Sequence, residues 1–292
     1  MQNLLKTRPR KNALMYYLTA LWIGLALYTI YKKVLVKRYV IIHWDPVTPD
    51  ISCHYSMEGD ALPAAEGAGF APAPRSIFFH ETSCRGGLDS RQACAVEAAA
   101  RSHPRRQVHL LFSAPVSQHV LDNSCIAKLL EHQNVNVARV HIVEYSKNTE
   151  IHSFITKYLA DSKLNRTDYP VEYTADVLRY ITLNKWGGIS MDLDMLVTRS
   201  LKSLPLNWIV RLSQTNIATG ILAFAKDDFG TDVTSTILKW RKCYSGNWIV
   251  RPVKTLCVQT TSQRCLFLKV FPERTYFIDK VASHCLSVPM YA

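Results

Sequence analysis

Short apolar blocks alternate with longer amphipathic stretches through the middle of the chain. Runs of apolar residues in Ile77–Phe79, Val108–Pro115 and Asn134–Tyr145 each predict a buried strand. Between and around them, Arg91–His103 and Ser124–His132 have the apolar spacing and composition of helices. Strands that alternate with helices indicate an α/β fold with a largely parallel sheet.

A further helix is predicted over Val171–Gly188, where apolar residues recur at helical spacing. Thr174 is placed to cap its start, and Gly187 is placed to end it. Asp176 and Arg179 are three residues apart, so they lie on neighbouring positions of one helix surface. Spacing alone favours an exposed salt bridge over a pair that faces a polar ligand.

The next stretch, KWGGISMDLDMLV, predicts a strand that carries two aspartates. Alternate residues of a strand share a face, so Asp192 and Asp194 would share one face. The other face would carry Ile189, Met191, Leu193 and Met195. Carboxylates beside a buried strand are costly unless they are paired or bind a cation. We therefore interpret the pair as ligands of a divalent ion at the carboxyl end of a strand, where parallel sheets bind their ligands. The alternative is a solvated strand edge.

Two carboxylates leave most of the coordination sphere of such an ion open. Mg²⁺ and Mn²⁺ prefer six oxygen ligands and commonly complete them with water and substrate phosphates. The pattern therefore favours a substrate with a diphosphate, such as a nucleotide-activated sugar. The sequence contains no EF-hand loop, no P-loop and no GxSxG elbow, which excludes those three kinds of site.

The N-terminal part of the chain predicts a membrane anchor followed by a linker. Ala13–Tyr31 contains no charged residue and is about as long as a bilayer-crossing helix, roughly 20 residues. Basic residues flank both ends, so charge does not set its orientation; a cleaved signal peptide and a buried core helix are the alternatives. After it, Ala61–Pro74 is rich in Ala, Gly and Pro and predicts an extended linker, with the folded part beginning at about Ser76.

The amino-acid composition and the distribution of charge indicate a folded protein and not a nucleic-acid-binding one. The chain is 48% hydrophobic and 20% charged, so we expect a folded core. The net charge is +12, but part of this excess flanks the apolar N-terminal segment, and no basic run is interleaved with aromatic residues. We therefore do not expect nucleic-acid binding.

The cysteines and one glycosylation sequon give information on the cellular compartment of the chain. The eight cysteines include no CxxC pair, which excludes a zinc ribbon and a thioredoxin-like site. An even number fits disulfides in a lumenal chain, whose pairing the sequence does not give, and free buried thiols are the alternative. Asn165 begins an Asn-Arg-Thr sequon and is a candidate glycosylation site on the lumenal side of a membrane.

Three stretches, SIFFHETSC, ACAVEAAARSHP and TADVLRYITLNKWGGISMDLDMLV, occur in an order that resembles the α1,4-glycosyltransferase family. The resemblance implies a GT-A nucleotide-diphospho-sugar transferase fold in a type II Golgi membrane protein with a lumenal catalytic domain. It implies transfer of galactose or N-acetylgalactosamine from a UDP-sugar, with retention of configuration and with Mn²⁺, to a terminal galactose-type residue of a lactosylceramide-like glycosphingolipid. The expected domains are a cytosolic tail (1–12), a signal anchor (13–31), a stem (32–75) and the catalytic domain (76–292).

The resemblance also implies roles for four residues. Asp192 and Asp194 correspond to the family's DxD pair, which would hold the metal, the diphosphate and the ribose. Asp176 and Arg179 correspond to a D-x-x-R helix that contacts the donor sugar in related GT-A enzymes. No catalytic nucleophile or base is identified.

The chain departs from the family's pattern at several positions. It has Thr219-Gly220 where Asn-Gly is common, and Arg251 where a glycine is expected. It also closes near His284 without a His-x-Trp-Asn segment, so we expect the C-terminal end of the catalytic domain to be incomplete.

These departures keep alternatives open. The chain could be a catalytically inactive relative, a transferase acting on glycoprotein glycans, or a membrane-anchored interaction protein. The donor sugar, the acceptor and the oligomeric state stay undetermined by the sequence.

Overall fold

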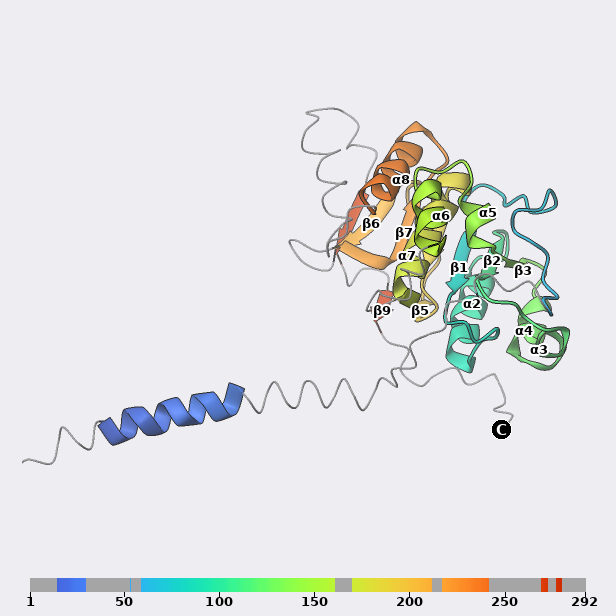
Figure 1. Cartoon of the computed structure of the whole chain (residues 1–292). Helices are drawn as coiled ribbons and strands as arrows, with labels where there is room; N and C mark the ends of the chain where they lie inside the picture. The colour runs from blue at the N-terminus through green and yellow to red at the C-terminus, as the bar shows by residue number, and fades with distance from the viewer. Residues whose placement is uncertain are drawn as a thin grey trace, which may run out of the picture. The chain divides into compact units, whose positions relative to one another are not determined.

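The computed structural model describes residues 15–29, 53, 59–160, 170–211, 217–241, 269–272 and 277–279. The chain divides into two units, 1–48 and 49–292, and each is described by itself. In the first unit, residues 15–29 form a helix whose side chains are exposed (Figure 1). Across all the described ranges, we find no helix that is both long enough and apolar enough to cross a bilayer.

The second unit is built on a seven-stranded sheet with the order β3-β2-β1-β4-β7-β6-β8 (Figure 1). Its strands are β1 (Ile77–Glu81), β2 (Val108–Phe112), β3 (Val135–Arg139), β4 (Gly188–Met191), β6 (Trp208–Arg211), β7 (Ile217–Phe224) and β8 (Lys269–Pro272). The pairs among β3, β2, β1 and β4 are parallel, as is the pair of β6 with β8. Strand β7 is antiparallel to both of its neighbours. The predicted mixed α/β class and largely parallel sheet are confirmed.

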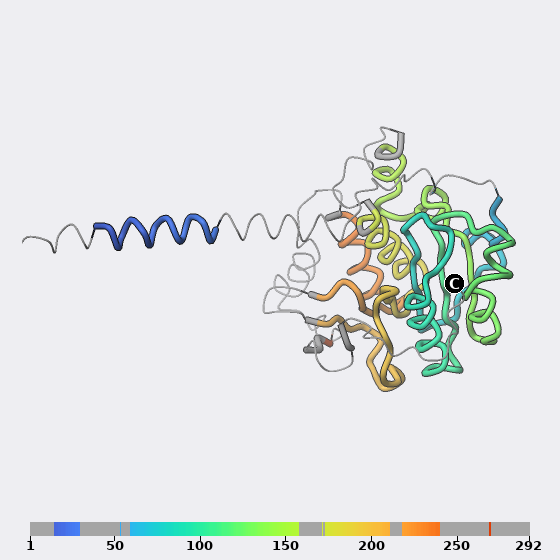
Figure 2. Tube along the Cα trace, turned by 90° about the horizontal axis from the view of Figure 1, so that it is seen from below, coloured from blue at the N-terminus to red at the C-terminus, as the bar shows by residue number. Residues whose placement is uncertain are grey.

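Helices follow the strands in chain order, and their paths can be traced in Figure 2. They are α2 (Ser90–Ser102), α3 (Gln118–Asn123), α4 (Cys125–Leu130), α5 (Ile142–Ser146), α6 (His152–Ala160), α7 (Pro170–Trp186), the 3-10 turn η3 (Leu201–Ser203) and α8 (Asp228–Arg241). A separate pair of antiparallel strands is formed by β5 (Met195–Val197) and β9 (Phe277–Asp279).

Both faces of the sheet are buried. Ile77 and Phe79 of β1 belong to a hydrophobic cluster that contains residues of α2 and α4. Phe78, between them in the sequence, belongs to a second cluster with residues of α5, α6, α7 and α8. Every residue of β1 and β2 is buried, which explains why these strands read as continuous apolar runs.

Residues 59–75 pack on the sheet, so the predicted linker over Ala61–Pro74 is wrong. The backbone N–H of Ala65 donates to Arg139 O (2.7 Å), and the N–H of Arg139 donates to Pro63 O (2.8 Å). Ala65 is 2% exposed. Small residues let this segment lie against the free edge of β3, where it satisfies backbone groups that an edge strand otherwise leaves open. The folded part therefore begins before Ser76.

Helix α7 starts earlier than predicted and ends where predicted. It begins at Pro170. Proline is tolerated in the first turn because backbone N–H groups there have no partner within the helix. The prediction that Thr174 caps the helix is therefore wrong. Thr174 instead lies buried inside the helix. Gly187 has φ 66 and donates its N–H to Leu183 O (2.9 Å), a left-handed end that glycine adopts without strain.

Candidate active site

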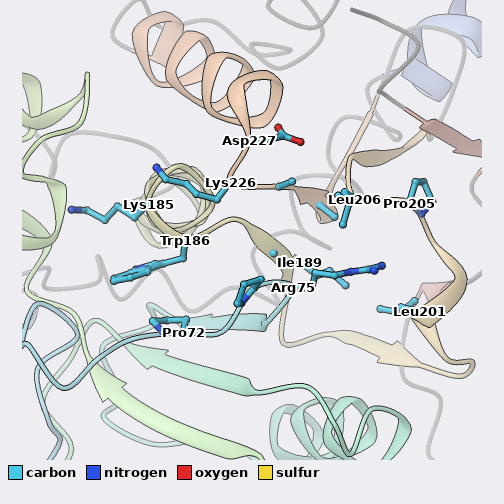
Figure 3. Close-up of a pocket in the computed structure, with 14 residues that line it drawn as sticks. Pro72, Arg75, Lys185, Trp186, Ile189, Leu201, Pro205, Leu206, Lys226 and Asp227 are labelled. Carbon is cyan, nitrogen blue, oxygen red and sulfur yellow. The ribbon is translucent and has the colours of Figure 1, made fainter.

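A cavity of about 500 Å³ lies at the amino end of β4 (Figure 3). Its size suits a small ligand, but it is lined mainly by apolar groups such as Trp186, Ile189 and Leu206. The basic side chains at its rim all donate to backbone carbonyls: Arg75 Nη2 to Leu204 O (2.9 Å), Lys185 Nζ to Lys147 O (3.0 Å) and Lys226 Nζ to Asn184 O (2.5 Å). None of the four residues expected to bind a donor lines this cavity.

The two aspartates of the DxD pair lie at the opposite, carboxyl end of β4. The strand ends at Met191, and Asp192 to Asp194 form a turn closed by the N–H of Met195, which donates to Asp192 O (3.0 Å). The prediction that both aspartates share one face of a continuous strand is therefore wrong. The chain turns here because the residues after Asp194 leave the main sheet and pair with β9.

The apolar part of the pattern explains how this turn is held. Ile189, Met191 and Leu193 are all buried in the cluster that covers one face of the sheet, as the alternation predicted. Leu193 reaches that cluster from within the turn, so its burial holds the backbone between the two carboxylates. The side chain of Asp192 is 37% exposed, and Asp194 is exposed.

Arg179 joins the helix motif to the turn motif. Its Nη1 donates to Asp176 Oδ1 (2.6 Å), and its Nη2 donates to Asp192 Oδ1. The arginine side chain is 3% exposed, so the exposed salt bridge that spacing favoured is wrong. Burial opposes the charge of Arg179, but the carboxylates of Asp192 and Asp176 outweigh it and raise the pKa of the guanidinium. A buried cation thus connects α7 to the turn that follows β4.

A buried polar network lies beside this cation and was not found from the sequence. His80 Nε2 is 2.9 Å from Thr182 Oγ1, and Tyr145 Oη is 3.1 Å from the same hydroxyl. Burial, together with the charge of Arg179, lowers the pKa of His80 to about 3, so the imidazole is neutral. The available signal was a lone histidine in the apolar strand IFFHE.

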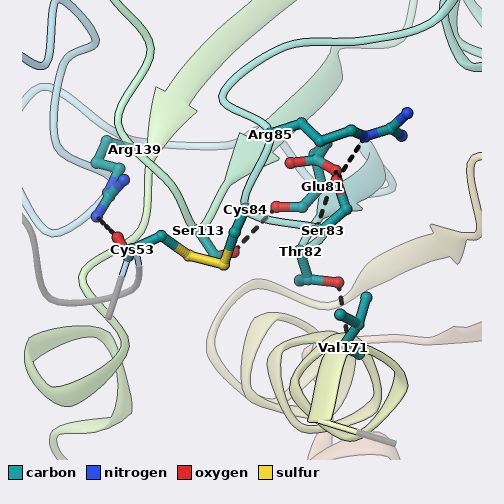
Figure 4. The surroundings of a disulfide bond; sticks show 9 residues. All are labelled: Cys53, Glu81, Thr82, Ser83, Cys84, Arg85, Ser113, Arg139 and Val171. Atoms are coloured by element: carbon teal, nitrogen blue, oxygen red, sulfur yellow. Dashed lines mark hydrogen bonds between the residues drawn. A yellow bond between two sulfur atoms is a disulfide. The ribbon is translucent and has the colours of Figure 1, made fainter. Parts of the chain in front are cut away.

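The loop after β1 lies at the same end of the sheet as the turn after β4, because these two strands are parallel neighbours. Figure 4 shows the residues of this loop. Glu81 is 1% exposed, its Oε1 accepts from the N–H of Ser83 (3.0 Å), and burial raises the pKa of its carboxyl group. Thr82 Oγ1 donates to Val171 O (3.2 Å) in the first turn of α7. The loop is therefore tied to the helix that carries Asp176 and Arg179.

Disulfides are present in the described part of the chain. Cys84, directly after this loop, is bonded to Cys53, and Arg139 Nη2 donates to Cys53 O (3.0 Å) (Figure 4). Cys94 is disulfide-bonded as well, whereas Cys125 is a free thiol. The alternative of free thiols is therefore wrong for Cys53, Cys84 and Cys94.

Gly220 of β7 closes the other side of the turn. Its carbonyl accepts from the N–H of Asp192 (2.8 Å). A Cβ at this position would lie 2.9 Å from Asp192 Oδ2 and 2.6 Å from Met195 Cε. The close approach explains why a glycine stands here, and the departure from the family's pattern at Thr219 leaves this glycine in place.

The residues at this edge fit a divalent ion that is completed by substrate. Asp192 and Asp194 supply hard oxygen ligands, and both are at least partly accessible to solvent. Within the described residues, no group of three or more His, Cys, Asp or Glu side chains could hold a metal. Water and substrate phosphates commonly complete the coordination of such an ion. Asn165, Arg251 and His284 lie outside the described residues.

Part of the chain is similar to known glycosyltransferases. Residues 89–211 match the family model described as a glycosyltransferase sugar-binding region containing a DXD motif, and this span holds Asp176, Arg179, Asp192 and Asp194. Lactosylceramide 4-alpha-galactosyltransferase from Mus musculus is 28% identical over 168 residues, which cover 56% of this chain and 46% of that protein. The protein of the same name from Homo sapiens is 30% identical over 135 residues, covering 46% of this chain and 37% of that protein. These matches support an assignment of the chain to the α1,4-glycosyltransferase family.

The similarity to these members of the α1,4-glycosyltransferase family spans less than half of their own length. Among solved structures, the PaToxG glycosyltransferase is similar with a TM-score of 0.48 and 14% identity, over 69% of this chain and 77% of that chain. At that TM-score the similarity does not assign a fold. The mixed α/β class follows from the topology of the sheet and its helices.

Proposed function

We propose that this chain is an enzyme of the α1,4-glycosyltransferase family with a GT-A fold. In the proposed reaction it transfers galactose or N-acetylgalactosamine from a UDP-sugar to a galactose-type residue of a lactosylceramide-like glycosphingolipid, in α1,4 linkage and with retention. The observation that carries the proposal is the buried Arg179, which joins Asp176 of the D-x-x-R helix to Asp192 of the DxD turn. Both motifs thereby meet at the carboxyl end of a strand, where α/β sheets bind ligands.

Each residue has a chemical part in this proposal. Asp192 and Asp194 would hold Mn²⁺, which stabilises negative charge on a departing diphosphate when it is bound. Asp176 would accept hydrogen bonds from donor-sugar hydroxyls, and Arg179 would donate to the anionic or hydroxyl oxygens of the donor. The burial of Leu193 and the close approach of Gly220 hold the turn so that both carboxylates stay at this edge.

The proposed setting is the Golgi lumen, with Ala13–Tyr31 as a type II signal anchor. The uncharged sequence of that segment and the helix over its residues 15–29 support this setting. The disulfide between Cys53 and Cys84 supports an oxidising compartment, and glycosylation of Asn165 is proposed with it.

The test uses the full-length chain in detergent. UDP-galactose and UDP-N-acetylgalactosamine are titrated with and without Mn²⁺, while product formation from lactosylceramide and from a galactose-terminated glycoprotein is followed. Asp194→Ala should abolish Mn²⁺-dependent donor binding, whereas Asp122→Ala, at an exposed site on α3, should not.

The outcomes separate the alternatives. Mn²⁺-dependent binding with glycolipid product supports the proposal, and glycoprotein product alone would replace the acceptor class. Binding without either product would identify an inactive relative. A folded chain with no Mn²⁺-dependent donor binding would overturn the proposal and favour an interaction protein.

A further inference from the structure

Arg179 donates a hydrogen bond to Asp192, one of the two carboxylates proposed to hold the metal. Its two terminal nitrogens are divided between Asp176 and Asp192, and the second of these bonds uses Asp192 Oδ1. The guanidinium therefore stands against one oxygen of a carboxylate that is proposed to hold the divalent ion. Two cations cannot share that oxygen at close range without strong repulsion.

We propose that Arg179 is a placeholder cation, which neutralises Asp192 when no metal is bound and gives up that contact when the metal binds. The inference rests on the proposed function and adds a role in coupling metal binding to donor binding. When Asp192 takes the ion, Nη2 of Arg179 loses an acceptor, and a phosphate or hydroxyl oxygen of the donor replaces it. A positioned arginine donor of this kind is well suited to phosphate oxygens.

The geometry decides which of the two contacts is released. Asp176 and Arg179 lie three residues apart on α7, whose neighbouring residues Val177 and Leu178 are fully buried, so this pair is held by a packed helix. Asp192 instead belongs to a turn, and its side chain is 37% exposed, against 20% for Asp176. The metal can therefore approach Asp192 from solvent while the arginine keeps Asp176. A cation that is 3% exposed needs that remaining partner, because a buried unpaired charge is strongly destabilising.

The arrangement makes the two ligands cooperative. Without nucleotide, the charge of Arg179 weakens the binding of Mn²⁺ at Asp192. With nucleotide bound, the negative charge of the diphosphate would offset the repulsion between the ion and Arg179. By linkage, the factor by which UDP tightens Mn²⁺ binding equals the factor by which Mn²⁺ tightens UDP binding.

A purely structural role for the ion pair makes a different prediction. If Arg179 and Asp176 only hold the site together, removing either residue should loosen it, and both changes should weaken Mn²⁺ binding. If Arg179 is a placeholder, the two changes act in opposite directions. Loss of Arg179 removes a competitor of the metal, whereas loss of the Asp176 charge leaves the whole guanidinium charge to Asp192.

The experiment measures Mn²⁺ binding without nucleotide by the loss of the free-ion electron paramagnetic resonance signal, using the full-length chain in detergent at fixed pH. Arg179→Met should tighten Mn²⁺ binding on the order of fivefold, and Asp176→Asn should weaken it by a similar factor. Arg179→Gln, which keeps an amide donor for Asp176, is measured beside Arg179→Met in case the apolar variant unfolds. Arg106→Met, a half-buried arginine near η3 that donates to Leu201 O (3.4 Å), is the matched control and should change nothing.

Repeating the titrations with UDP gives the second readout. UDP should tighten Mn²⁺ binding to the wild-type chain more than to either Arg179 variant. The placeholder role would be overturned if both Arg179 variants bound Mn²⁺ more weakly than the wild-type chain. It would also be overturned if UDP tightened Mn²⁺ binding by the same factor in the variants as in the wild-type chain. The proposed function would stand in either case. Absence of Mn²⁺ binding to the folded wild-type chain, even with UDP, would overturn the proposed function and the placeholder role together.

Discussion

The two ends of β4 hold their charged side chains in different ways. At the amino end, Arg75, Lys185 and Lys226 surround a cavity of about 500 Å³, and each donates to a backbone carbonyl. At the carboxyl end, the buried Arg179 is held between two side-chain carboxylates. The first set completes the backbone hydrogen bonding of the fold. The second set consists of charged side chains whose contacts a ligand can replace. The proposed active site is therefore indicated by these charged side chains and not by the presence of a cavity.

The cross-link at the carboxyl end should produce the largest change in stability. The disulfide between Cys53 and Cys84 closes a sequence separation of 31 residues, and Cys84→Ser should lower the free energy of unfolding by about 3 to 4 kcal/mol. The expected readout is a lower midpoint of denaturant unfolding, together with weaker UDP binding, because the loop with Glu81 and Thr82 loses its tether. Cys125→Ser, at a free thiol, serves as the control. Equal midpoints for both variants would show that the cross-link does not stabilise this end.

Acid should destabilise the molecule partly through His80. The folded-state pKa of His80 is lowered by burial and by Arg179 to about 3, from the usual value of 6.5 for histidine. The unfolded chain takes up the proton and the folded chain does not, so the stability from neutral His80 is present above pH 6.5 and is lost as the pH falls below it. Between pH 7 and pH 5 this loss is about 2 kcal/mol. His80→Gln should show a shallower decline in unfolding free energy over this interval, and an unchanged decline would contradict the assignment.

The close approach of Gly220 to Asp192 should be visible in donor binding. Gly220→Ala places a methyl group against Asp192 Oδ2 and Met195 Cε, which should displace the carboxylate and weaken Mn²⁺-dependent UDP binding about tenfold. Calorimetric titration of UDP in the presence of Mn²⁺ measures the change. Gly69→Ala, where a Cβ would meet nothing within 4 Å, is the matched control. Equal affinities in the two variants would mean that the turn relaxes without moving the carboxylate.

The smallest effect is expected at the amino-end cavity. Leu206 lines this cavity and is 48% exposed, so Leu206→Arg can be accommodated at the surface. UDP and Mn²⁺ affinities should change by less than about twofold, because substitutions at exposed positions away from a site are usually near neutral. A large loss of donor binding in a folded Leu206→Arg chain would erase the distinction drawn between the two ends of β4.

The strand positions could be read from the sequence because burial on both faces leaves continuous apolar runs, as in β1 and β2. Gly187 could be placed for a similar reason, since a glycine after a periodic stretch supplies the left-handed helix end. These features depend on a few residues that are close together in the chain.

The turn at Asp192 could not be predicted, because it depends on strand pairing with β9, more than eighty residues later in the sequence. The burial of Arg179 also depends on Asp192 from another element, so helix spacing alone favoured an exposed salt bridge. His80 gave only the weak signal of one polar residue in an apolar strand. Contacts between distant segments therefore set the parts of the site that periodicity missed.

The pairing of Pro63 and Ala65 with β3 determines which fragments of this protein can stay monomeric. An uncovered edge strand offers its backbone groups to the same edge of another molecule, which leads to sheet-to-sheet aggregation. A fragment cut at Ser76 would remove the cover from Arg139 and expose that edge, whereas one that begins at residue 49 keeps the cover and both cysteines of the Cys53–Cys84 bond. The alanine- and proline-rich segment should therefore reduce self-association by covering this edge strand.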